Sequence, residues 1–118
     1  MGCTTACITS NEGTAVTKVA DIAIVCDTGA EVITGSTRLK AGNSQKFVLN
    51  MLSTCAMIKT GKVYENLMIN LKPSNEKLKL RVIRITSQIL GVDESIAEKL
   101  LEKHDWDIRK TVESVDTL

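Results

Sequence analysis

The chain has 118 residues, with 15 lysines and arginines against 14 acidic residues and a formal net charge of +1. A hydrophobic fraction of 43% is enough to bury a core, whereas near-neutral charge and 3% aromatic residues argue against nucleic-acid binding. Without an apolar run of roughly 18 residues or a basic and apolar leader, we expect a cytoplasmic protein with no membrane partner.

The first quarter of the chain predicts two buried strands that flank a short helix. Residues 5–9 and 21–26 are β-branched runs bounded by turn residues, and residues 14–20 allow about two helical turns. This order favours parallel pairing of the strands. Two strands alone leave unpaired edges, so we expect a partner surface, supplied by further chain or by self-association into a homo-oligomer.

A long helix is expected over about residues 37–60. Ser36 or Thr37 is placed to cap it, and Gly61 is placed to end it with a positive φ angle. Its apolar residues lie on more than one face, which predicts a largely buried helix.

The start of this predicted helix carries cations where the helix dipole favours acidic residues. A bound anion would remove the conflict, because Ser36, Thr37 and the first-turn amides can donate to phosphate oxygens while Arg38 and Lys40 neutralise the charge. The window 32–64 contains five cations and no acidic residue. The alternative interpretation is a solvated basic face.

Residues 62–72 lack helix signals and predict an extended linker that Pro73 closes. Three capped amphipathic helices should follow. Ser74 or Asn75 opens the first and Gly91 ends it, whereas Asp93 and Asp105 are the expected caps of the second and third. Trp106 is expected to pack in the joint between the second and third of these helices and to hold it in place. His104 is expected to be an exposed residue at a helix end.

The cysteines give no sign of a metal site. Cys3, Cys7, Cys26 and Cys55 lack Cys-x-x-Cys spacing and lie far in sequence from the single histidine, which argues against zinc. We therefore expect small buried hydrophobic residues and no metal ligands.

Several segments together resemble N-acetylmuramic acid 6-phosphate etherases. The stretches that carry the resemblance are EVITGSTRLKAG at 31–42, QK at 45–46, VLNMLST at 48–54, GKVY at 61–64, NLM at 66–68 and NEKL at 75–78. The resemblance covers nearly the whole chain but only the C-terminal portion of that family. It implies a lyase that releases D-lactate from a sugar phosphate during bacterial cell-wall recycling, without a metal or nucleotide cofactor.

The same resemblance implies a fold class and a domain division. Residues 1–72 would be the end of a sugar isomerase (SIS) domain, an α/β fragment of a parallel three-layer structure. Residues 73–118 would be a small all-α three-helix module similar to ubiquitin-associated (UBA) domains, so that the chain is helix-rich overall.

The resemblance also implies site residues, and a second interpretation remains open. Glu31, Ser36, Thr37, Arg38 and Lys40 match the phosphosugar-binding motif. The family's principal acid and base lie in its N-terminal half, so no catalytic residue is expected here, and Glu31 should position a sugar hydroxyl or the loop backbone. A weaker likeness to glucokinase regulatory proteins leaves a non-catalytic sugar-phosphate-binding regulator as the alternative. Departures from the family pattern include Cys55 and Glu65, each in place of a glycine.

Overall fold

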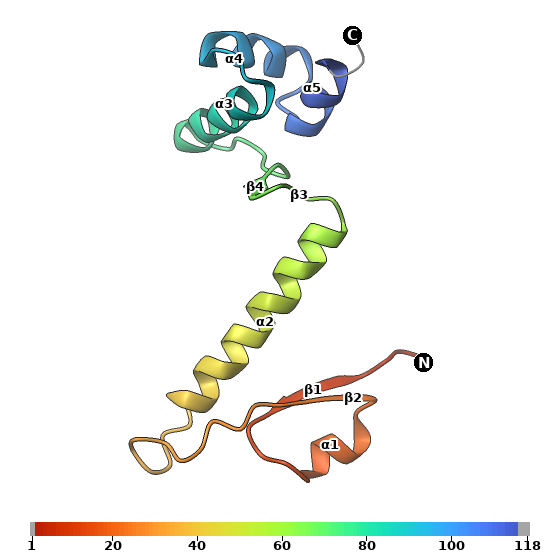
Figure 1. The fold of residues 1–118 in the computed structure, drawn as a ribbon, viewed down its shortest axis with the longest axis vertical. Coiled ribbons are helices and arrows are strands. Elements are labelled where there is room, and N and C mark those ends of the chain that lie inside the picture. The colour runs from red at the N-terminus through yellow and green to blue at the C-terminus, as the bar shows by residue number, and fades with distance from the viewer. Residues whose placement is uncertain (1, 116–118) are drawn as a thin grey trace. The chain divides into compact units, whose positions relative to one another are not determined.

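The computed structural model describes residues 2–115, and the chain divides into two compact units (Figure 1). The N-terminal unit is Met1–Cys55 and the C-terminal unit is Ala56–Leu118. The boundary between them falls inside the long helix α2 (Lys40–Lys59). The chain is helix-rich and carries one small parallel sheet, in agreement with the predicted mixture of elements.

The N-terminal unit begins with the predicted strand, helix and strand. Strands β1 (Ala6–Thr9) and β2 (Ile22–Val25) pair in parallel, and helix α1 (Ala15–Val19) connects them. The Asp21 carboxylate joins the two strand starts by accepting hydrogen bonds from the Thr5 amide at 2.7 Å and its hydroxyl at 2.8 Å. These bonds lower the pKa of Asp21.

The predicted burial of these strands is wrong. All four residues of β1 and of β2 are exposed or half-buried, and Ile22 remains 52% exposed. A two-stranded sheet with one five-residue helix has too little material to cover both of its faces. The β-branched composition therefore predicted the strands correctly. It did not predict whether other layers cover the sheet.

Helix α2 ends as predicted but is not buried. Gly61 has a φ of 68°, its amide donates to Ile58, and the Lys62 amide donates to Met57, each at 2.9 Å, which is a Schellman ending. None of the helix residues is buried, and Phe47 is 68% exposed. The expectation of a largely buried helix is therefore wrong, because neither unit supplies a layer that covers its apolar faces.

The four cysteines are also less buried than expected. Cys3 and Cys55 are exposed, whereas Cys7 and Cys26 are half-buried. Cys7 and Cys26 lie in or next to the parallel strand pair, and Cys55 lies on α2. The exposure of Cys7, Cys26 and Cys55 has the same cause as that of the strands and of α2.

After the end of α2, the C-terminal unit forms a hairpin in place of the predicted extended linker. Strands β3 (Val63–Tyr64) and β4 (Leu67–Met68) pair antiparallel around a two-residue turn. Glu65 occupies this turn with a φ of 51°, a conformation that favours glycine. The sequence did not predict the hairpin, because a glutamate occupies the turn position where a glycine would indicate a turn.

Three helices then pack around one small core. They are α3 (Glu76–Leu90), α4 (Glu94–Lys103) and α5 (Ile108–Val115). The Asn75 side chain caps α3 by accepting from the Leu78 amide at 2.9 Å, and Gly91 ends it in the left-handed conformation, as predicted. The core consists of Val82, Ile83, Ala97, Leu101 and Ile108.

The joint between α4 and α5 differs from the prediction in its cap. Asp107, not Asp105, caps α5, because its carboxylate accepts from the Lys110 amide at 3.1 Å. Asp105 and Trp106 instead have φ angles of 53° and 59°, which turn the chain. Trp106 packs against the core as expected, with the Lys79 ammonium 4.7 Å from the centre of its ring.

Two buried threonines in this core make a matched pair for a stability test. The Thr86 hydroxyl has no hydrogen-bond partner among the residues described, whereas the Thr111 hydroxyl donates to the Asp107 carbonyl at 2.7 Å. Both side chains are fully buried. An unpaired buried hydroxyl costs free energy, and its replacement by a methyl group removes that cost.

We expect Thr86→Val to raise the free energy of unfolding by about 1 kcal/mol and Thr111→Val to lower it by about the same amount. Urea unfolding followed by circular dichroism measures both changes. Shifts of the same sign in the two variants would show that the unpaired Thr86 hydroxyl does not limit stability.

Candidate functional site

The predicted anion-binding segment forms a series of turns before α2. Ser36 donates its amide to Ile33 at 3.0 Å, Leu39 donates to Ser36 at 3.3 Å, and Gly42 donates to Thr37 at 2.9 Å. These turns take the place of the first predicted helical residues, so the helix begins at Lys40 rather than at Ser36 or Thr37. Ser36, Thr37 and Arg38 consequently lie in the approach to the helix.

Glu31 caps the helix from nine residues upstream. One carboxylate oxygen accepts from the Lys40 amide at 2.8 Å, and the other accepts from the Ala41 amide at 3.0 Å. The amides of Ala41 and Lys40 lower the pKa of Glu31, and the positive charge of Lys40 adds to this effect. This contact places Glu31 against the loop backbone, where its negative charge also suits the helix dipole.

The capping carboxylate changes which groups remain for a ligand. Two amides of the first helical turn are occupied by Glu31, so they are not available to a phosphate in this conformation. Within residues 2–115, the amides of Thr37 and Arg38 find no hydrogen-bond acceptor. Arg38 and Lys40 are exposed, and the Ser36 side chain is half-buried beside them in sequence. The remaining donors are therefore two amides, two hydroxyls and two cations.

The cap should respond to acid in a defined direction. Because folding lowers the pKa of Glu31 below its usual value of 4.5, the cap contributes fully above that pH and is lost as the pH falls through the folded pKa. We expect the amide NMR signals of Lys40 and Ala41 to titrate together in this acidic range. Glu31→Gln should abolish that titration, whereas Glu12→Gln should leave it intact. Persistence in the Glu31 variant would contradict the cap.

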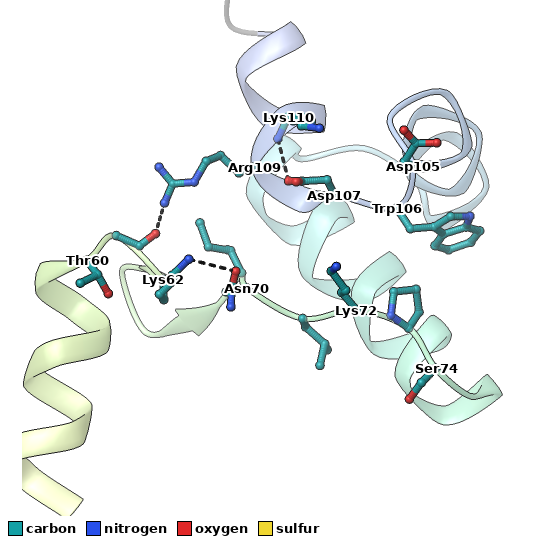
Figure 2. Close-up of a pocket in the computed structure, with 14 residues that line it drawn as sticks. Thr60, Lys62, Asn70, Lys72, Ser74, Asp105, Trp106, Asp107, Arg109 and Lys110 are labelled. Carbon is teal, nitrogen blue, oxygen red and sulfur yellow. Dashed lines mark hydrogen bonds between the residues drawn. The ribbon is translucent and has the colours of Figure 1, made fainter.

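A hollow that the sequence did not indicate lies within the C-terminal unit. It has a volume of about 660 Å³, and its walls come from the segment 60–62, the segment 69–74, the joint before α5 and the first turn of α5 (Figure 2). Its charged lining residues are four cations and two acids, namely Lys62, Lys72, Arg109, Lys110, Asp105 and Asp107. An adjoining hollow of about 350 Å³ is lined mainly by apolar side chains.

Neither metal ligation nor a membrane span is found in the part of the chain that the structure describes. Residues 2–115 contain no group of three or more histidine, cysteine, aspartate and glutamate side chains that could hold a metal ion. No helix in the same range is long and apolar enough to cross a membrane.

This helix-rich α/β chain is similar in sequence to proteins that are named as etherases. It is 49% identical over 112 residues to a protein of Oceanobacillus iheyensis named N-acetylmuramic acid 6-phosphate etherase, which matches 95% of this chain and 38% of the relative. Proteins of the same name from Symbiobacterium thermophilum and Clostridium botulinum strain Loch Maree are 48% and 47% identical, over 95% and 99% of this chain. No family model matches the chain.

The match is therefore nearly complete for this chain and partial for its relatives. The chain spans only 37% to 39% of the length of these curated proteins. The high identity supports the resemblance to etherases that the motifs indicated.

Proposed function

We propose that this chain is the C-terminal portion of an etherase-like protein that releases D-lactate from N-acetylmuramic acid 6-phosphate. The observation that carries this proposal is the identity of 47% to 49% to etherases over 95% to 99% of the chain. The chain contributes part of the phosphosugar site through Glu31, Ser36, Thr37, Arg38 and Lys40. Arg38 and Lys40 neutralise the phosphate, and the hydroxyls of Ser36 and Thr37 donate to its oxygens.

Glu31 acts in this proposal as a positioning residue. Its two oxygens are held by the start of α2, and its lowered pKa keeps it ionised near neutral pH. Such a carboxylate is a poor general acid and a weak base, since catalytic pKa values lie near the operating pH. The acid and base of the reaction therefore belong to the rest of the protein, and the chain alone should release no lactate.

The domain assignment follows the same proposal. Residues 1–72 form the end of an SIS domain, and residues 73–118 form a UBA-like module. The uncovered faces of the parallel β1–β2 pair and of α2 support the first assignment, because they need further layers. The three helices around one core support the second.

A chimera tests the proposed function directly. The matching segment of the Oceanobacillus iheyensis etherase is replaced by this chain, and D-lactate release from N-acetylmuramic acid 6-phosphate is measured. We expect release by the chimera, and none by the relative without that segment or by this chain alone. A folded chimera that binds the sugar phosphate without releasing lactate would contradict the etherase assignment and favour the regulator.

The uncovered apolar surface also predicts self-association of the isolated chain. Large apolar side chains of α2 are about half exposed or more, among them Phe47, Leu49, Met51, Leu52, Met57 and Ile58. Apolar surface of this kind favours association, and the parallel strand pair has open edges. Light scattering over a concentration series should show a dimer or a larger species. A monomer at the highest concentration would contradict this expectation.

A further inference from the structure

The hollow in the C-terminal unit combines a surplus of positive charge with the size of a small-molecule site. Its lining includes Lys62, Lys72, Arg109 and Lys110, and its volume of about 660 Å³ lies within the range of roughly 300 to 1,000 Å³ typical of ligand pockets. Every lining residue belongs to the C-terminal unit. The hollow therefore does not depend on how the two units are arranged.

The two acidic lining residues cancel only part of this charge, because the lining holds four cations. The Asp107 carboxylate accepts from the Lys110 amide as the cap of α5, so one of its oxygens is already engaged. Figure 2 shows Asp105 beside Trp106 at one end of the hollow, whereas Lys62 and Arg109 lie at the other end. No ion pair to Lys62, Lys72 or Lys110 occurs among residues 2–115.

Neutral donors and acceptors complete the lining. Lys62 lies 3.4 Å from the Asn70 side-chain oxygen, and Arg109 donates to the Gly61 carbonyl (Figure 2). Ser74 adds a hydroxyl group, whereas the Thr60 hydroxyl already donates to the backbone of α2. Lysine ammonium groups bind phosphate as point charges, and hydroxyl and amide groups match the polar groups of a small ligand.

We propose that this hollow binds a small phosphate monoester, with Lys62, Lys72 and Lys110 neutralising the phosphate. The site is separate in sequence from residues 31–40 and does not rest on the proposed etherase function. Phosphate chemistry fits better than an extended nucleic acid, because the hollow is of small-molecule size and the chain holds only three aromatic residues for stacking.

Trp106 provides the readout, because it is the only tryptophan of the chain and lines the hollow. The full chain carrying Arg38→Ala, which weakens the separate site proposed at residues 31–40, is titrated with glucose 6-phosphate, inorganic phosphate and glucose. Equilibrium dialysis of the same chain with labelled phosphate measures binding independently of fluorescence. We expect saturable binding of glucose 6-phosphate and none of glucose. Comparable binding of inorganic phosphate would show that the phosphate group alone is recognised, which also supports the site.

Matched variants separate a defined site from bulk charge. Lys72→Gln and Lys110→Gln should each raise the dissociation constant about two- to fivefold, the scale of an exposed ionic contact. Lys99→Gln removes an exposed lysine of α4 outside the hollow and should change nothing. Circular dichroism verifies that each variant is folded.

Two results would overturn the proposal. One is the absence of saturable binding in both assays up to about 10 mM ligand. The other is an equal loss of affinity in the Lys99, Lys72 and Lys110 variants. Because Arg38 is not part of this hollow, a failure here leaves the proposed etherase function standing, and the converse also holds.

Discussion

Leu101→Ala should lower the free energy of unfolding of the C-terminal unit by about 2 to 5 kcal/mol. Leu101 is fully buried and belongs to the core that joins α3, α4 and α5. Its truncation removes apolar contacts and leaves a cavity that the surrounding helices fill only in part. A loss of this size is a large share of the stability of a small domain, so the variant should be substantially unfolded near room temperature.

Ile96→Ala is the matched control for this prediction. Ile96 lies on the same helix but is 47% exposed, so its truncation leaves no closed cavity and should cost less than about 1.5 kcal/mol. Urea unfolding followed by Trp106 fluorescence measures both variants, because Trp106 packs against the same core. Equal losses would show that Leu101 does not hold the three helices together.

Local signals in the sequence predicted the parts of the fold that depend on a few neighbouring residues. Gly61 and Gly91 end their helices with positive φ, and Asn75 caps α3, because each feature is decided within one helical turn. The parallel pairing of β1 and β2 also followed from the order of strand, short helix and strand. These elements do not need a distant partner to be specified.

Features that depend on distant residues were predicted less well. The start of α2 is set by Glu31, nine residues before Lys40, and helix-capping rules that examine adjacent positions do not find such a cap. The burial of α2 and of the two strands depends on layers that the described chain does not provide. Apolar composition indicates that a segment favours burial, but it does not show which other segment covers it.

The same distinction applies to the candidate sites. The cations Arg38 and Lys40 were visible because they stand together at a helix start, where their charge conflicts with the dipole. The hollow of the C-terminal unit was not visible, because Lys62 and Lys72 lie far in sequence from Arg109 and Lys110, and folding brings them together. Asp105 and Asp107 lie two positions apart; Asp105 has a φ of 53°, and Asp107 accepts the capping hydrogen bond of α5.

Ligand binding by the chimera with the Oceanobacillus iheyensis etherase tests whether Arg38 forms part of a phosphosugar site. The ligands are N-acetylglucosamine 6-phosphate, which is the sugar phosphate after loss of lactate, and unphosphorylated N-acetylglucosamine. Arg38→Ala removes a cation beside the approach to α2. Lys59→Ala removes the same charge at the last residue of the same helix.

Calorimetric titration of the parent chimera and both variants with both ligands decides the matter. A charge-assisted hydrogen bond contributes about 1.5 to 3 kcal/mol, so Arg38→Ala should weaken the phosphorylated sugar roughly tenfold to somewhat over a hundredfold. Its effect on the unphosphorylated sugar should be small, and Lys59→Ala should have little effect on either ligand. Equal losses of affinity for the phosphorylated sugar in the two variants would contradict the claim and reduce the motif to a basic surface.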